Sequence, residues 1–268
     1  RRCGRASESR ARRHSESTAG SRNSSRNSRI GSGAAPGGSS GHESEVNMFY
    51  AFDIETMPDR AKINSLPEPE VKLGNLKDEA KIAEKKNEAR AEQIAKMALN
   101  PLYGRICAAV FVASDGNGEL ESLRFAAGDD DAEEAVLISG CFDVLRLDCA
   151  RIVTWNGIGF DLPFLFKRAA LLGVPLDGVP VLTHWTRRYS TAAHIDLMQI
   201  WSGWDAQQYA KLDDVGGAVV DDHKIKIDVR DFPELVKTEE GRTRILDYCE
   251  QDVRLTYKIF KKFNGVLF

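Results

Sequence analysis

The sequence predicts an α/β fold in which helices pack on a mixed sheet. Three β patterns come first, and the second and third are joined by the turn signal Asp115-Gly116-Asn117-Gly118. A helical pattern, a short strand and a second helical pattern then follow along the chain. This order of elements, a strand meander followed by helix, strand and helix, is typical of a mixed sheet with helices packed on it.

Residues 48–268 are expected to form the folded part of the chain. At 268 residues with 42% hydrophobic content, the chain can build one sizeable core. Residues 1–47 are rich in Ser, Arg and Gly and cannot bury enough apolar area to fold, so we expect a disordered leader. Its arginines outnumber its acids and leave the rest of the chain acidic, and weak nucleic-acid binding by these arginines is the alternative.

Cysteine and histidine usage excludes several classes of protein. The five cysteines show no Cys-x-x-Cys spacing and the five histidines no metal-ligating pair, so we expect reduced thiols and no zinc site. No apolar run reaches the roughly 18 residues that span a membrane, and the N-terminus lacks the apolar core of a secretory signal. We therefore expect a cytoplasmic or nucleoid-type intracellular protein that is not secreted and has no membrane partner.

The stretch from Met48 to Thr56 carries the first two candidate site residues. Its apolar residues predict a strand buried on both faces, and Asp53 and Glu55 lie near its end. Strand side chains alternate, so these two carboxylates point the same way. Like charges at the end of a buried strand need a compensating cation or donor, and hard divalent ions prefer oxygen ligands. A strand that runs out into a solvated turn at 56–58 is the alternative.

The elements between the first strand and the remaining motifs are predicted from periodicity. They are a long charged helix from about Lys72 to Leu99, strands at Arg105–Ala113, Leu120–Ala126 and Arg151–Trp155, and an amphipathic helix at Asp129–Leu147. The charged helix makes residues 60–100 a helical insertion after the first strand. Its Lys and Glu content indicates a solvated surface, and steering of a nucleic-acid strand by its lysines is the alternative.

A glycine-containing turn leads into a helix that begins at Asp161. Gly157 and Gly159 predict a tight backbone path, which allows a ligand to approach closely. Asp161 is a candidate site residue, but the position equally suits an N-cap. On the last predicted helix, Arg242–Phe263, Tyr248 and Asp252 lie four residues apart and therefore on one face. A packed tyrosine and a solvated aspartate would explain that pair equally well.

The motifs combine Asp-x-Glu on a strand, Asn-x-x-x-Phe-Asp entering a helix and Tyr-x-x-x-Asp on a last helix. This combination resembles the DEDD superfamily of 3′-to-5′ exonucleases in its Tyr-containing branch, and more narrowly the proofreading exonuclease domain of family B DNA polymerases. Segments 194–198 and 211–215 also fit, so the resemblance covers about residues 48–268. It implies a ribonuclease H-like fold with a mixed five-stranded sheet, and a nucleic-acid substrate with a free 3′ end.

The resemblance also implies the roles of the site residues. Asp53, Glu55, Asp161 and Asp252 would bind two Mg²⁺ or Mn²⁺ ions, and Tyr248 would lie beside the attacking water. Our hypothesis is that Asp53 bridges both ions and that Asp161 supports the second ion. Glu55 and Asp252 would complete the site that activates water, with the Tyr248 hydroxyl orienting or deprotonating it.

Substrate contacts are expected from residues next to the motifs. The candidates are Ile54, Thr56, Trp155, Asn156 and Phe160. Stacking on Trp155, Phe160 or Phe52 could hold the terminal base, although each of these side chains also fits a core position. Asp196 is expected to be structural or to support the site from outside rather than to act in catalysis.

The expected function is metal-dependent removal of nucleotides from the 3′ end of DNA, preferably single-stranded. Three alternatives remain open: an exoribonuclease of the same fold, a catalytically idle nucleic-acid-binding module, and a phosphatase built on carboxylates and metal. Because the chain ends shortly after Asp252, we expect no polymerising module and action alone or through a protein partner.

Overall fold

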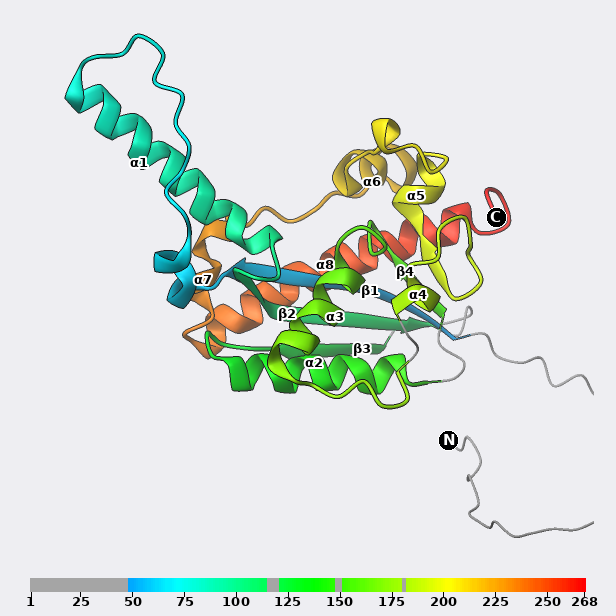
Figure 1. The fold of residues 1–268 in the computed structure, drawn as a ribbon. Coiled ribbons are helices and arrows are strands. Elements are labelled where there is room, and N and C mark those ends of the chain that lie inside the picture. The colour runs from blue at the N-terminus through cyan, green and yellow to red at the C-terminus, as the bar shows by residue number, and fades with distance from the viewer. Residues whose placement is uncertain (1–47, 115–120, 148–150, 180–181) are drawn as a thin grey trace, which may run out of the picture. The chain divides into compact units, whose positions relative to one another are not determined.

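A five-stranded sheet forms the centre of the protein (Figure 1). The computed structural model describes residues 48–114, 121–147, 151–179 and 182–268. The strands are β1 (Phe49–Pro58), β2 (Gly104–Ser114), β3 (Glu121–Ala126), β4 (Arg151–Thr154) and β5 (His194–Asp196), in the order β3-β2-β1-β4-β5. β2 pairs antiparallel with both β1 and β3, whereas β4 pairs parallel with both β1 and β5. The predicted mixed five-stranded sheet is therefore confirmed.

Helices cover both faces of the sheet (Figure 1). They are α1 (Glu79–Lys96), α2 (Asp131–Leu145), α3 (Asp161–Leu172), α4 (Leu182–Trp185), α5 (Leu197–Trp201), α6 (Leu212–Val220), α7 (Phe232–Leu235) and α8 (Glu239–Phe263). Short 3-10 helices are η1 (Arg60–Ser65), η2 (Met97–Leu99), η3 (Ala206–Gln208) and η4 (Val229–Asp231). Among the helices of the described ranges, none combines the length and the apolar character required to cross a bilayer.

The alternation of β1 side chains divides the core into two parts. Phe52 and Ile54 pack with α2 and α3 on one face of the sheet. Ala51 lies on the opposite face, where Cys249 and Val253 of α8 belong to the same cluster. Asp53 and Glu55 share this second face by the period of two, so they point the same way, as predicted, and lie on the side of the sheet that α8 covers.

The charged insertion contains a shorter helix than predicted. Helix α1 begins at Glu79 rather than near Lys72, because Gly74 takes a left-handed φ of 55° and the Asp78 side chain caps the helix at Ala80. None of its residues is buried, which confirms a solvent-exposed helix. Arg90 anchors the helix by donating to the backbone carbonyls of Ile63 and Pro67 at 2.7 and 3.1 Å.

Other predicted boundaries differ by a few residues. Helix α2 starts at Asp131 because the Asp130 side chain accepts the Glu133 N–H and caps it. The predicted turn at 115–118, Leu120, and the leader at residues 1–47 lie outside the described residues. Cys107, Cys141 and Cys249 are buried free thiols, as expected, while Cys3 and Cys149 also fall outside the described ranges.

Candidate active site

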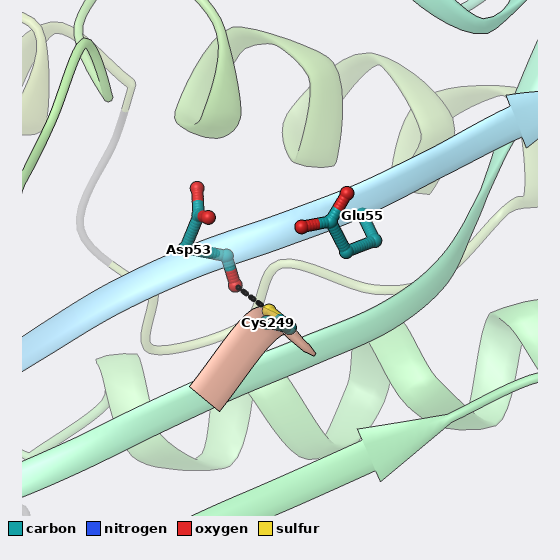
Figure 2. Close-up of side chains that lie close together, drawn as sticks. All are labelled: Asp53, Glu55 and Cys249. Carbon is teal, nitrogen blue, oxygen red and sulfur yellow. Dashed lines mark hydrogen bonds between the residues drawn. The ribbon is translucent and has the colours of Figure 1, made fainter. Parts of the chain in front are cut away.

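Two buried thiols flank the part of β1 that carries Asp53 and Glu55. The β1–β2 register shifts between Glu55 and Thr56, which leaves Cys107 as an extra residue in β2. The Cys107 thiol donates to the Glu55 carbonyl at 3.4 Å. From the other side, the Cys249 thiol of α8 donates to the Asp53 carbonyl at 3.6 Å (Figure 2). The backbone that presents both carboxylates is thus fixed by neighbouring elements.

Asp161 joins the first turn of α3 to β1. Its side chain is buried, and Oδ1 accepts the Ile54 N–H at 3.2 Å. The N-cap position of α3 is Phe160, and no side chain caps the helix there. The explanation of Asp161 as an N-cap is therefore wrong, because Phe160 holds that position and the Asp161 carboxylate accepts an N–H group of β1.

The turn between β4 and α3 is held by Asp196 at the end of β5. Its two carboxylate oxygens accept the N–H groups of Asn156 and Ile158 at 3.1 and 2.9 Å. Asn156 adopts a left-handed φ of 73°. A Cβ atom on Gly157 would approach Oγ1 of Thr154 to 2.4 Å, so the predicted tight backbone path is confirmed. Asp196 shapes the turn that delivers Asp161, which is the supporting role expected for it.

Helix α8 brings Tyr248 and Asp252 to the same side of β1. Asp252 is 1% exposed, and Tyr248 is half-buried. Lys224, from the segment between α6 and η4, places Nζ 2.5 Å from Oδ2 of Asp252 and 5.3 Å from the centre of the Tyr248 ring. The sequence prediction missed Lys224, since a single lysine in a polar connection gives no local signal of its partners.

Burial and mutual repulsion perturb the carboxylates that the structure brings together. Burial, followed by the charges of Asp161 and Asp252, raises the pKa of Asp53 well above its usual value. Burial and then Asp53 do the same to the pKa of Glu55. Burial raises the pKa of Asp161 to about 7, although hydrogen bonds with Asp53 and the Ile54 N–H act to lower it. Interaction between the two carboxyl groups further raises the pKa of Asp53 and lowers that of Asp161.

Lys224 offsets only part of this excess of negative charge. Burial raises the pKa of Asp252, although Lys224 acts in the opposite direction. Burial opposes protonation of Lys224, but Asp252, Tyr248 and Asp53 together outweigh it, and the pKa of the lysine rises. Burial, with Glu55 and Asp252, raises the pKa of Tyr248 to about 12, so its hydroxyl stays protonated at neutral pH.

The donor set fits divalent cations. Four carboxylates from β1, α3 and α8 face one region, and such oxygen donors suit Mg²⁺ and Mn²⁺. Oδ1 of Asp252 is buried and accepts no hydrogen bond of ordinary geometry from the residues that the structure describes. A buried carboxylate oxygen without a donor is costly, and a bound cation would satisfy it.

A cleft of about 430 Å³ opens beside Asp53. Its walls include Trp155 and Asn156 from the turn, and Lys211 and Lys224 from the segments around α6. The Trp155 indole donates to the Ala210 carbonyl at 3.3 Å, which fixes the ring at the cleft. An apolar ring and two cations beside a group of carboxylates suit a ligand that has both a ring system and negative charge.

The other three predicted substrate contacts lie elsewhere around the site. The Ile54 side chain belongs to the core on the α2 and α3 face. Phe160 packs against the same core, with its ring 5.4 Å from that of Phe164. Thr56 donates to the Ala98 carbonyl at 2.8 Å and lines a second, apolar cleft of about 350 Å³ at the base of α1. Substrate roles for these residues stay predictions.

A family model matches residues 98–266, more than half of the chain, and describes a predicted 3′-5′ exonuclease related to the exonuclease domain of PolB. The chain belongs to this exonuclease family. The match includes Asp161, Tyr248 and Asp252 but starts after β1. Asp53 and Glu55 therefore lie outside the matched residues, and the fold brings them to the same site. Membership confirms the resemblance read from the three motifs.

Relatives of the chain include DNA polymerases of archaea. DNA polymerase 1 of Aeropyrum pernix is 26% identical over 52% of this chain and 14% of the polymerase. DNA polymerase 1 of Saccharolobus solfataricus is 31% identical over 50% of this chain and 15% of its own length. The family B DNA polymerase structure from Pyrobaculum calidifontis shares the fold, with a TM-score of 0.52 and 23% identity over 81% of this chain and 24% of that chain. The chain spans a small part of each polymerase.

Proposed function

We propose that this protein is a metal-dependent 3′-5′ exonuclease that removes nucleotides from single-stranded DNA by two-metal-ion hydrolysis, with residues 48–268 as its exonuclease domain. The carrying observation is the convergence of Asp53, Glu55, Asp161 and Asp252 from three separate elements, with Tyr248 beside them. Membership in the PolB-type family supports the direction of digestion, and relatives named DNA polymerase support DNA as substrate.

Asp53, Glu55, Asp161 and Asp252 would hold the ions. Bound there, two divalent cations would neutralise the phosphoryl charge, stabilise the leaving oxygen and lower the pKa of the attacking water. The four carboxylates repel one another without cations, so ion binding relieves an existing cost. Because of this repulsion, we expect the nuclease activity to depend strictly on divalent cations.

Tyr248 and Lys224 would position the reacting groups. With a pKa of about 12, the Tyr248 hydroxyl keeps its proton and can orient water by donating or accepting a hydrogen bond. Lys224 lies against both Tyr248 and Asp252 and limits their freedom to rotate. Its positive charge also lies at the cleft, where a phosphate would be attracted.

The cleft beside Asp53 supports a single-stranded substrate. Trp155 lines the cleft, where its ring would stack on a terminal base, and stacking of this kind tolerates any base sequence. Asp53 lines the same cleft, so a nucleotide held there would present its 5′ phosphate to the carboxylates. Lys211 and Lys224 would offset the repulsion between that phosphate and an acidic protein.

Digestion of 5′-labelled single-stranded DNA, with matched RNA and duplex DNA, tests the proposal in millimolar Mg²⁺ or Mn²⁺. We expect a ladder that shortens from the 3′ end of single-stranded DNA, abolished by EDTA and by Asp252→Asn. Tyr248→Phe should slow the reaction by about a hundredfold, in the range of general acid–base effects. Preferential digestion of RNA would move the substrate assignment to an exoribonuclease, since sugar preference rests on the relatives alone. Binding without cleavage by folded protein would overturn the nuclease proposal.

A further inference from the structure

A thiol lies among the carboxylates of β1. Sγ of Cys249 and one carboxylate oxygen each of Asp53 and Glu55 lie within 4.8 Å of one another (Figure 2). Cys249 is wholly buried, and its hydrogen bond to the Asp53 carbonyl keeps the sulfur against the strand. Oxygen ligands alone suit Mg²⁺ and Mn²⁺, but a sulfur among them changes which ions the group can hold.

The dimensions of this group suit a small thiophilic ion. Zinc is tetrahedral, with bonds of about 2.3 Å to sulfur and about 2.0–2.2 Å to carboxylate oxygen, so two ligands of one ion lie roughly 3.6 Å apart. The three atoms lie within 4.8 Å of one another and therefore need to close by at most roughly 1 Å. Asp252 follows three residues further along α8, and its buried Oδ1 accepts no hydrogen bond of ordinary geometry from the described residues.

We propose that Cys249 turns the acidic cluster into a binding site for Zn²⁺, held by Cys249, Asp53 and Glu55, that excludes the catalytic ions and inhibits the enzyme. The thiol proton would leave to solvent when sulfur binds the ion, and the hydrogen bond to the Asp53 carbonyl would break. The inference rests on the proposed function for the role of the carboxylates, but Zn²⁺ binding itself requires no nuclease activity.

Cadmium is the probe, because sulfur bound to Cd²⁺ gives an ultraviolet charge-transfer band and Cd²⁺ has the same preference for thiolate. The metal-free full-length chain would be titrated with Cd²⁺ alongside Cys249→Ser and Cys107→Ser. Cys107 is the matched control, since it is also buried and its thiol donates to the carbonyl of Glu55, the next carboxylate-bearing residue of β1. Each variant keeps the other four cysteines, so background binding to Cys3 and Cys149 is the same in both.

We expect the saturable band in the wild type and in Cys107→Ser, and its loss in Cys249→Ser. Equal bands in the two serine variants would overturn the proposal. If Cys249→Ser fails to fold, Asp53→Asn serves instead: it keeps the thiol but removes a carboxylate, and a band unchanged by it would also refute the site. Circular dichroism of each variant reports folding.

Inhibition of DNA digestion by Zn²⁺ tests whether metal binding at Cys249 blocks the nuclease reaction. In the Mg²⁺-supported digestion assay, Cys249→Ser should need at least about tenfold more Zn²⁺ for half-inhibition than Cys107→Ser, as expected for loss of a metal ligand. Equal sensitivity of the two variants would contradict an inhibitory role. A Cd²⁺ band without any nuclease activity would support the metal site and count against the proposed function, whereas activity without the band would do the reverse.

Discussion

Two groups of buried charged side chains lie at β1 and β2, and they differ in charge balance. The first is the acidic cluster of Asp53, Glu55, Asp161 and Asp252, which has Lys224 as its cation. The second, which we call the ion-pair cluster, contains the buried residues Asp59, Arg105, Glu134 and Arg168, with the exposed Asp131 at its edge. The first has four carboxylates for one cation, whereas the second has two buried carboxylates for two guanidinium groups.

The ion-pair cluster satisfies its own charges. Arg168 donates through Nε and Nη2 to the two oxygens of Glu134 at 2.7 and 2.5 Å, and Glu134 also accepts the Ile106 N–H. Arg105 pairs with Asp59 at 3.1 Å. Although burial alone would raise the pKa of Asp59, Arg105 lowers it below its usual value. Burial is therefore compatible with ordinary ionisation when a guanidinium matches each carboxylate.

The acidic cluster responds to burial in the opposite way, because its carboxylates face one another and the pKa values rise. The difference distinguishes a group that stabilises the fold from one that is completed by a ligand. Charge balance, rather than burial or the number of charged residues, is what marks the candidate active site.

The largest expected effect comes from removing a carboxylate of the acidic cluster. Asp53→Asn should lower the rate of 3′-end digestion by about three orders of magnitude, equivalent to several kcal/mol of lost transition-state stabilisation. The same change relieves repulsion, so unfolding in urea with EDTA should show equal or greater stability than the wild type. A near wild-type rate would remove Asp53 from the proposed site.

Breaking the ion-pair cluster should do the reverse. Arg168→Met leaves the buried carboxylate of Glu134 without its guanidinium, and stability should fall by about 3–5 kcal/mol. Urea unfolding measures the loss, which millimolar Mg²⁺ should not restore. Recovery of stability by Mg²⁺ in this variant would show that the two clusters do not differ as described.

The pH dependence should reveal the acidic cluster in the metal-free protein. The folded-state pKa of Asp161 is raised to about 7, so the folded chain holds a proton that the unfolded chain has lost. This contribution to stability is complete below about pH 4 and is lost as the pH rises to about 7. Melting temperatures across this range should fall less steeply in Asp161→Asn than in the wild type. A wild-type slope in that variant would contradict the assignment.

Divalent cations should cancel much of that loss. Deprotonated carboxylates bind Mg²⁺ better, so the increase in melting temperature on adding millimolar Mg²⁺ should grow as the pH rises. An increase that is the same at both ends of the range would argue against binding at these carboxylates.

The smallest effect should come from Lys224. Lys224→Met removes the cation beside Asp252 and should cost about 2 kcal/mol of stability in EDTA, in the range for a hydrogen bond to a charged group. A bound cation can replace the lysine charge, so Mg²⁺ should reduce the deficit. Lys224→Arg, which keeps the charge, is the matched control, and urea unfolding with and without Mg²⁺ compares the variants.

The sequence alone was sufficient to predict that the two candidate site residues of β1 lie on one face of the strand. The period of two places Asp53 and Glu55 on one face wherever the strand lies in the sheet, and the apolar residues around them require burial. Tyr248 and Asp252 follow from helical geometry in the same way. Local periodicity is enough when both residues of a pair lie on one regular element.

Contacts between distant segments could not be predicted from local patterns. Lys224 forms an ion pair with Asp252 from a connection without regular structure. The Asp161 carboxylate accepts the N–H of Ile54, which lies 107 residues away in the sequence. The start of α1 was misplaced because the Lys and Glu pattern continues through Gly74, whereas the backbone turns there. These features depend on tertiary packing and on single backbone conformations.

The bond from the Ile54 N–H to Asp161 has a consequence for the thermodynamics of ion binding. Strand β4 pairs with β1 only at 49–51, so beyond Ala51 the edge of β1 is available to the side chain of Asp161. A carboxylate tied to a strand backbone is already ordered before any ion arrives. Ion binding should therefore involve little loss of conformational entropy and little change in heat capacity, and its affinity should follow the ionic charge and radius.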